Sequence, residues 1–176
     1  PEIEITIDPV KTPAENAQKY FAKYNKAKRT LAALDIQKKQ NDEELIYLES
    51  ILNSLESSNS DSDLLEIREE LVDAGYTKRK SFKKGKGQKI KKSKPMHYIS
   101  SEGFDIFVGK SNIQNDDLTL HFAGPGDLWL HTKNIPGSHV IIKTEGKCND
   151  INDLPDNTLI EAANLAVLNS KAKDGT

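Results

Sequence analysis

The chain has 176 residues, of which 36% are hydrophobic and 30% are charged, and its net charge is −2. This apolar content favours one modest core joined to an extended segment over a globule of the full length. The single cysteine, Cys148, excludes an internal disulfide framework and fits a reducing compartment, and no apolar run is long enough for a membrane span or arranged as a signal peptide.

The first elements are a short strand and a long helix. Glu2–Ile7 alternates apolar and polar residues, which predicts a strand. Thr12 is the expected N-cap of the helix, because Pro13 suits the first helical position and Glu15 completes a capping box. The helix is predicted to run from 13 to about 58.

Apolar residues recur along this helix at alternating spacings of three and four, without a glycine or an internal proline. Such a seam predicts one strand of a coiled coil, and Lys38 and Asn41 are its polar interruptions. No second long heptad segment follows, so we expect the seam to pair with another chain, another copy or a part of the parent protein outside this sequence. Packing on a globular core is the alternative. The seam residues are Ala17, Tyr20, Tyr24, Ala27, Leu31, Leu34, Leu45, Leu48, Leu52 and Leu55.

A second helix and a basic segment come next. Asp63 is the expected N-cap of the helix, with Glu66 completing the box and Gly75 ending it. Lys78–Lys94 then contains ten Lys or Arg residues and no acidic residue; the remaining 15 basic residues stand against 27 acidic ones. Ten cations without acids attract a polyanion, although a solvated spacer is the alternative. The lysines expected to contact nucleic acid here are Lys83, Lys84, Lys86, Lys89, Lys91 and Lys92.

The rest of the chain predicts a small, mainly antiparallel sheet with a covering helix after Pro155, so the fold class is α+β. We expect three segments: a coiled-coil arm over 1–76, a lysine-rich linker over 77–95 and a small sheet domain over 96–176. The predicted strands are Met96–Ser100 and Phe104–Val108, which form a hairpin, then Leu118–Phe122, Asp127–His131 and His139–Lys143, with a turn or short helix over Asn112–Asp117.

The densest group of functional side chains lies around the fourth of these strands. Asp127, Trp129 and His131 share one strand face, and Ser138 and His139 follow a Pro-Gly turn. A tryptophan on a polar face suits stacking on a base, although a core position is the alternative. Metal binding and Ser-His-Asp hydrolysis are disfavoured, because no short paired-histidine motif and no nucleophile elbow are present. We therefore expect no catalytic residue, no metal and no cofactor.

A second group follows the hairpin, where hydrogen-bonding side chains are close together in the sequence. Gly109-Lys110-Ser111 fails as a phosphate loop, since the upstream glycine of that motif would fall at Phe104. The alternative to nucleic-acid contact is a turn held by its own side chains. The residues of this second group predicted to contact nucleic acid are Lys110, Asn112, Gln114 and Asn115. Lys133, which lies between His131 and Ser138 of the first group, is predicted to contact nucleic acid as well.

Several stretches together resemble the NFACT family, and the last of them is highly specific. The resemblance implies the second strand of the family's middle coiled coil followed by most of its NFACT-R domain. It therefore implies that 96–176 is an RNA-binding domain that lacks its last strands. One departure is Ser111, where the family usually has a second Asn. The matching stretches are Asn16–Lys28, Glu66–Leu71 with Gly75–Tyr76, Val108–Asp116 and Asp127–His139.

The resemblance also implies a function in ribosome-associated quality control in the cytoplasm. Family members bind an obstructed large ribosomal subunit that holds a peptidyl-tRNA, recruit tRNA and support C-terminal tailing, with alanine in bacteria. This chain would supply an arm and a module that binds rRNA or tRNA, without an active centre and without a membrane. The historical family name, fibronectin-binding protein A, provides the alternative of a surface adhesin that binds fibronectin.

Overall fold

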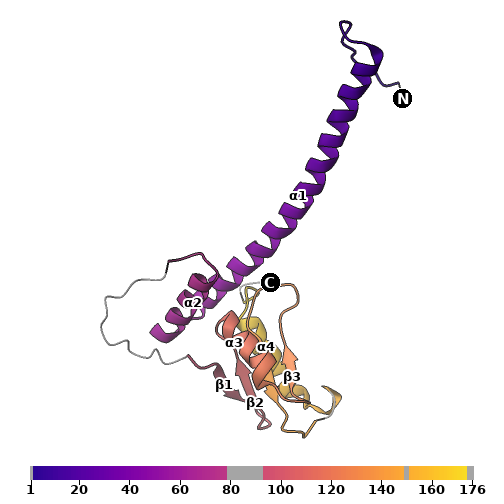
Figure 1. Cartoon of the computed structure of the whole chain (residues 1–176). Coiled ribbons are helices and arrows are strands. Elements are labelled where there is room, and N and C mark those ends of the chain that lie inside the picture. Colours follow the sequence, from indigo (N-terminus) through magenta and orange to yellow (C-terminus); the bar gives the residue numbers. More distant parts are fainter. Residues whose placement is uncertain (1, 79–92, 149–150, 174–176) are drawn as a thin grey trace. The chain divides into compact units, whose positions relative to one another are not determined.

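The computed structural model describes residues 2–78, 93–148 and 151–173. By packing, the chain divides into two compact units, Pro1–Leu45 and Ile46–Thr176. The predicted segments 1–76, 77–95 and 96–176 remain a prediction. Figure 1 labels the helices and strands in chain order.

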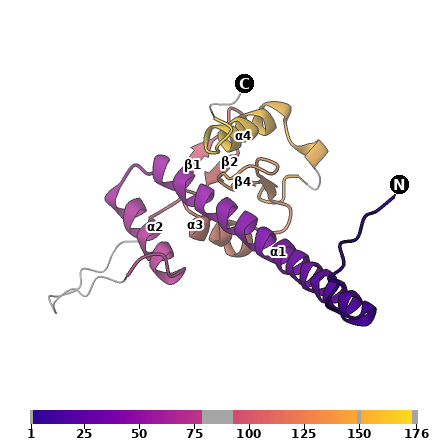
Figure 2. The same ribbon diagram turned by 90° about the horizontal axis from the view of Figure 1, so that it is seen from above.

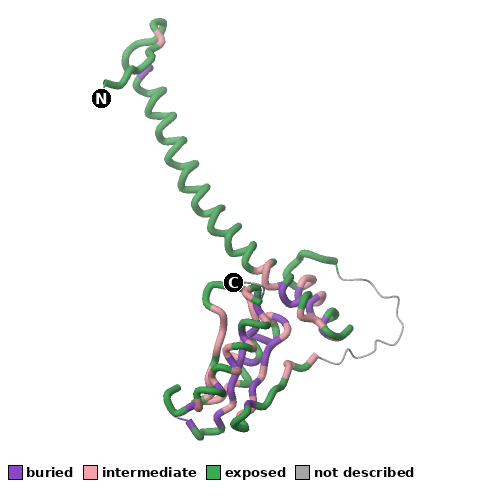
Figure 3. The backbone as a smooth tube through the Cα atoms, turned by 180° about the vertical axis from the view of Figure 1, so that it is seen from behind, coloured by how far each residue is buried: buried purple, intermediate pink, exposed green. Residues whose placement is uncertain are grey.

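Helix α1, Pro13–Glu56, begins as its sequence predicts. The backbone N–H of Thr12 donates to Glu15 Oε2 at 2.7 Å, and the N–H of Glu15 donates to Thr12 Oγ1 at 3.3 Å. These two hydrogen bonds are the reciprocal pair of a capping box. The pKa of Glu15 is lowered because its carboxylate accepts hydrogen bonds from the backbone N–H and from the hydroxyl of Thr12. Within the first unit, the seam residues Leu31 and Leu34 are exposed, and Figure 3 shows the helix exposed along most of that unit.

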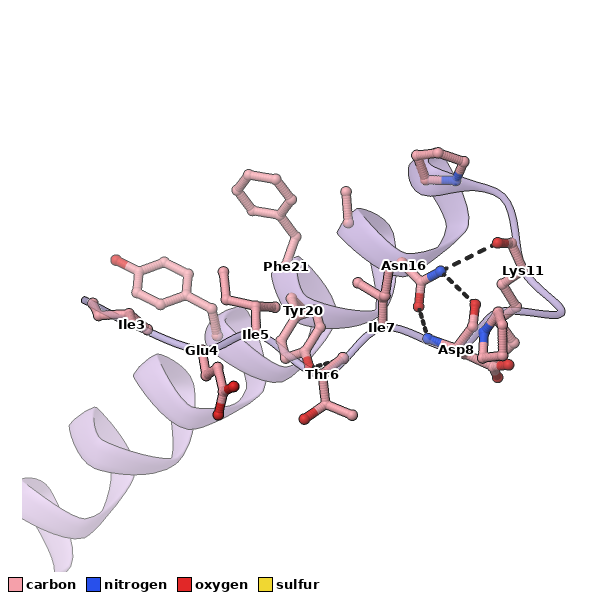
Figure 4. Close-up of a pocket in the computed structure, with 14 residues that line it drawn as sticks. Ile3, Glu4, Ile5, Thr6, Ile7, Asp8, Lys11, Asn16, Tyr20 and Phe21 are labelled. Atoms are coloured by element: carbon pink, nitrogen blue, oxygen red, sulfur yellow. Dashed lines mark hydrogen bonds and ion pairs between the residues drawn. The ribbon is translucent and has the colours of Figure 1, made fainter.

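The strand predicted at Glu2–Ile7 is wrong. This segment is extended but pairs with no strand among the described residues, and it lies along the first turns of α1 (Figure 4). Tyr20 Oη donates to the carbonyl of Thr6 at 2.5 Å, and the Asn16 side chain binds both backbone groups of Asp8 at 2.9 and 3.0 Å. A two-residue periodicity needs a neighbouring strand to become a sheet, and here α1 takes that place.

Helix α2, Asp61–Asp73, begins earlier than predicted. Its N-cap is Ser60 and not Asp63, because Ser60 Oγ accepts a hydrogen bond from the Asp63 N–H at 3.2 Å. The predicted end at Gly75 is confirmed. Gly75 has φ of +84°, and the N–H of Tyr76 donates to the carbonyl of Leu71 at 2.9 Å, which is the Schellman arrangement of a helix end.

The second unit contains a four-stranded antiparallel sheet of order β1-β2-β4-β3. The predicted hairpin between the first two strands is confirmed, and its turn contains Gly103 with φ of +83°. The strands are β1 Met96–Ile99, β2 Asp105–Val108, β3 Leu128–Leu130 and β4 Val140–Lys143.

Helix α4, Asp156–Leu168, covers one face of the sheet, so the predicted α+β fold with a covering helix is confirmed. Figure 2 shows the strands between α4 and α3. The 3₁₀ turn η2, Ile151–Asp153, precedes α4. Alternate strand residues point toward α4 and exclude water there, which is the main stabilising contribution to this unit. The core cluster contains Ile106, Val108, Val140, Ile142, Cys148, Leu154, Ala162 and Ala166.

The other side of the sheet has α3, Asn112–Asp117, and the π-helix η1, Leu118–Phe122. The strand predicted at Leu118–Phe122 is therefore wrong. Ser111 caps α3 by accepting from the Gln114 N–H at 3.2 Å, and the chain continues helically until the Ala123 N–H donates to the Leu118 carbonyl at 2.8 Å. Alternation of Leu118, Leu120 and Phe122 imitates a strand, but Leu118 is buried whereas Leu120 is 72% exposed.

Candidate nucleic-acid interface

Three aromatic rings meet at the edge of the sheet. Trp129 is on β3, His131 follows β3, and His139 precedes β4. The Trp129 ring stacks on His131 at 5.8 Å between centroids and meets His139 edge-on at 5.2 Å; the two histidine rings are 5.1 Å apart. Leu128 and Leu130 pack toward the core, so strand alternation turns Trp129 outward, where it is 50% exposed. The alternative of a core tryptophan is therefore wrong.

His139 is held from two sides. Its Nδ1 lies 2.8 Å from Thr119 Oγ1, and its backbone N–H donates to Asn115 Oδ1 at 2.9 Å. Asn115 Nδ2 donates in turn to the Gly137 carbonyl at 3.3 Å. Asn115, predicted as a nucleic-acid contact, is thus buried and positions His139 for the three-ring cluster.

Both histidines of the cluster favour the neutral form. Burial lowers the pKa of His139, the charge of His131 lowers it further, and a hydrogen bond with the Asn115 backbone opposes this. Burial also lowers the pKa of His131, against a hydrogen bond with the Gly137 backbone. A neutral imidazole carries no charge that water must hydrate, so the two histidine rings add a flat surface beside Trp129.

Asp127 does not share this exposed surface. Its side chain is only 4% exposed and is an ion-pair partner of Lys143. Its two oxygens accept from the N–H groups of Gly124 at 2.7 Å and Thr144 at 2.9 Å. Burial raises the pKa of Asp127, but hydrogen bonds from Lys143 and these two N–H groups outweigh it and lower the pKa. Asp127 therefore holds the turn before β3.

Ser138 and Lys133 lie on either side of the Pro-Gly turn. Ser138 is 4% exposed, and its N–H donates to the Asn169 carbonyl at 2.9 Å. Gly137 has no room for a side chain, since a Cβ there would lie 2.6 Å from Ser170 Cβ. Lys133 is exposed and lies two residues after His131. Of these two predicted contacts, only Lys133 is presented to solvent.

Lys110 is engaged within the second unit. Its Nζ lies 3.2 Å from Asp63 Oδ1 of α2, and the two side chains are 18% and 1% exposed. The Asp63 carboxylate also accepts from Ser93 Oγ. Burial raises the pKa of Asp63, but these hydrogen bonds, with those from Ser60 and Asn59, outweigh it and lower the pKa from 3.8 to about 2.

The α3 side chains continue these contacts. Asn112 Nδ2 donates to Ser50 Oγ of α1 at 2.8 Å and to Glu70 Oε1 of α2 at 2.9 Å. Gln114 Nε2 donates to Glu66 Oε2 of α2 at 2.8 Å. Lys110, Asn112 and Gln114 were predicted to contact nucleic acid, and in the structure their side chains bind the protein itself.

Two lysines that follow α4 extend this set of contacts, and the sequence analysis missed them. Lys171 Nζ lies 2.5 Å from Glu49 Oε1, and Lys173 Nζ lies 2.8 Å from Glu56 Oε2. Both glutamates are on α1, more than 100 residues earlier in the chain. Opposite charges are common in this sequence, so no local signal identified these pairs.

The lysines predicted to contact nucleic acid between the two domains, Lys83, Lys84, Lys86, Lys89, Lys91 and Lys92, lie outside the described residues. Among the residues that the structure describes, no group of three His, Cys, Asp or Glu side chains is arranged to hold a metal ion. No helix in the described ranges is long and apolar enough to cross a membrane.

Family comparisons agree with this architecture. Residues 1–91 match the family described as NFACT N-terminal and middle domains, and residues 94–176 match the NFACT protein RNA binding domain. The chain belongs to the NFACT family.

Individual NFACT relatives are similar over different lengths. The chain is 44% identical over 176 residues to the Rqc2 homolog RqcH of Bacillus subtilis (strain 168), covering 100% of this chain and 30% of that protein. It is 35% identical over 77 residues to ribosome quality control complex subunit 2 of Schizosaccharomyces pombe, covering 44% of this chain and 7% of that protein. The chain therefore spans less than a third of these relatives.

A solved structure is also similar. It is the C-terminal part of the fibronectin/fibrinogen-binding protein from Streptococcus suis, with 38% identity and a TM-score of 0.76. The match covers 93% of this chain and 62% of that one. In this NFACT chain the three-ring cluster of Trp129, His131 and His139 lies within the region matched by the RNA-binding domain.

Proposed function

We propose that this chain is the RNA-binding part of a ribosome quality control factor. The observation that carries the proposal is the three-ring cluster of Trp129, His131 and His139, in which Trp129 is exposed, in a domain whose family binds RNA. The names of its relatives, an Rqc2 homolog and a ribosome quality control complex subunit, support the general role.

The physical argument begins with the cost of exposing Trp129. A large ring that is 50% exposed beside two neutral imidazoles has an apolar surface that water covers unfavourably. Stacking a base on such a surface contributes about 1–3 kcal/mol per base without requiring a particular sequence. Lys133 is exposed and lies close to Trp129 and His131 in the sequence. Its positive charge suits contact with a phosphate.

The finer function is part of the same proposal, and the family resemblance supports it. The full-length protein binds an obstructed large ribosomal subunit with its peptidyl-tRNA, recruits tRNA and supports alanine tailing of the stalled chain in the cytoplasm. The part described here contributes contacts with rRNA or tRNA and has no catalytic centre of its own. The basic segment from Lys78 to Lys94 adds salt-dependent attraction to the RNA backbone.

The direct test is fluorescence anisotropy of a labelled single-stranded RNA with Trp129→Ala. We expect affinity to fall by about tenfold, since tenfold corresponds to about 1.4 kcal/mol, within the range of one stacked base. Leu120→Ala is the matched control, because Leu120 is an exposed apolar residue that is not one of the three rings. Unchanged affinity of the Trp129 variant, or affinity that does not depend on salt, would contradict the proposal. Co-sedimentation of the full-length protein with 50S subunits tests the ribosomal partner.

The α1 seam has its own partner in this proposal. Within the first unit its leucines and tyrosines remain exposed, among them Leu31 and Tyr24 at 63% and 61%. In the full-length protein we propose that an earlier segment of the same chain covers them as the other strand of the coiled coil. In the isolated piece a second copy takes that place.

A surface adhesin is the second candidate, favoured by the name of the structural relative from Streptococcus suis, a fibronectin/fibrinogen-binding protein. It requires the protein on the outside of intact cells and binding to fibronectin. Surface labelling of cells, compared with sucrose-gradient fractions that contain ribosomes, separates the two functions. Recovery only with ribosomes would exclude the adhesin.

A further inference from the structure

One cross-strand row joins both edges of the sheet. His97 of β1 is registered with Phe107 of β2, Phe107 with Ile141 of β4, and Ile141 with Trp129 of β3. Ile141, in the middle of the row, is fully buried, whereas Trp129 at one end is half-exposed. Paired residues lie on the same face of a sheet, so His97 and Trp129 are the two ends of one row on that face.

The His97 end of this row is an aromatic wall. The His97 ring stacks on Phe107 with centroids 4.5 Å apart and planes inclined by 10°. Phe122 of η1 meets Phe107 edge-on at 4.7 Å. Two neighbours fix the outer rings: His97 Nε2 lies 2.6 Å from Asp105 Oδ1, and Lys143 Nζ lies 4.8 Å from the Phe122 centroid. The wall is therefore preorganised.

These rings border a cavity of about 650 Å³ inside the second unit. That volume is within the usual range of small-molecule pockets, roughly 300–1,000 Å³. Lys94, the last cation of the basic segment, is one of the residues that line it. Three carboxylates also line the cavity, those of Glu66, Asp116 and Asp117, and they can accept hydrogen bonds.

The charges of the lining decide which part of a nucleotide fits. Asp116 and Asp117 are exposed and repel a phosphate, so the cavity does not suit the RNA backbone. Carboxylates instead accept hydrogen bonds from exocyclic amino groups, which adenine, cytosine and guanine have and uracil lacks. An aromatic wall with acceptors beside it matches a flat base that carries such a group.

Resting on the proposed RNA-binding function, we propose that this cavity is a second base-binding site that takes an amino-bearing base of single-stranded RNA. The site is separate from the three-ring cluster, and one strand of RNA reaches both. Three spacings of about 4.8 Å separate β1 from β3, so the ends of the row are about 14 Å apart. That distance corresponds to about four stacked nucleotides at 3.4 Å each.

The test measures anisotropy with the oligonucleotides A8, U8 and A2. We expect the wild-type chain to prefer A8 over U8 and to bind A2 far more weakly, because A2 cannot reach both sites. Phe122→Ala should weaken A8 about tenfold, and Asp116→Asn should reduce the preference for A8 over U8. Leu120→Ala, on the same helix as Phe122, is the control. If Phe122→Ala alters the circular dichroism spectrum, His97→Ala is used to test the second site instead.

The outcomes separate this site from the proposed function. If Trp129→Ala weakens A8 but Phe122→Ala and His97→Ala do not, RNA binding stands and the second site is overturned. If A8 does not bind the wild-type chain, both the proposed RNA-binding function and the second base-binding site are overturned. If a lysine-rich peptide binds in a Phe122-dependent manner and A8 does not, the cavity takes a basic peptide, and the base-binding site is likewise overturned.

Discussion

Asp63→Asn tests the contacts that hold α2 within the second unit. The Asp63 side chain is 1% exposed and its pKa falls from 3.8 to about 2. One pKa unit corresponds to 1.36 kcal/mol, so the ionised carboxylate contributes about 2 kcal/mol to folding at neutral pH. Removing its charge also leaves Lys110 without its partner at 18% exposure, which adds to the loss.

Urea denaturation followed by circular dichroism at several pH values measures this contribution. Because the folded pKa is depressed, the stabilisation is complete above pH 3.8 and is lost as the pH falls toward 2. Wild-type chain and variant should therefore differ by about 2 kcal/mol at pH 7 and converge near pH 2.

Asp61→Asn is the matched control, because Asp61 is in the same first turn but exposed. A similar loss in the control would assign the effect to the helix dipole. A variant as stable as the wild-type chain at pH 7, or a difference that persists at pH 2, would refute the assignment to the Asp63 carboxylate.

Three further changes are predicted. Gly109→Ala places a Cβ 2.2 Å from Asn115 Oδ1 and should cost about 1–3 kcal/mol of unfolding free energy, whereas Gly124→Ala, with its nearest atom at 3.4 Å, should cost much less; thermal melts compare them. Leu31→Glu should abolish self-association in sedimentation velocity and leave the melting of the second unit unchanged. The wild-type chain should lose unfolding free energy as the pH falls below 6.5, because the fold favours neutral His139. His139→Gln should make this loss smaller, because glutamine does not titrate. An equal pH dependence in both proteins would contradict this.

Features determined by neighbouring residues were predicted correctly. The capping box of Thr12 and Glu15, the end of α2 at Gly75 and the hairpin around Gly103 depend on backbone groups a few positions apart. Alternation on β3 likewise predicted that Leu128 faces the core and Trp129 faces outward.

Periodicity failed where the partner of a segment decided its structure. Glu2–Ile7 and Leu118–Phe122 both alternate as strands do, yet the first lies along α1 and the second is a π-helix. An alternating segment becomes a strand only when a neighbouring strand completes its hydrogen bonds, and a local pattern does not reveal that neighbour.

The candidate site shows the same division. By itself the sequence determined the family, the α+β class and the outward Trp129, because these depend on motifs and local alternation. Only the tertiary structure decided that Asn112 binds Ser50 and Glu70, which are 62 and 42 residues away. It also decided that His97 and Trp129 end one row. Polar side chains suited to RNA are equally suited to protein partners, and the choice between them depends on which surfaces folding brings within hydrogen-bond distance.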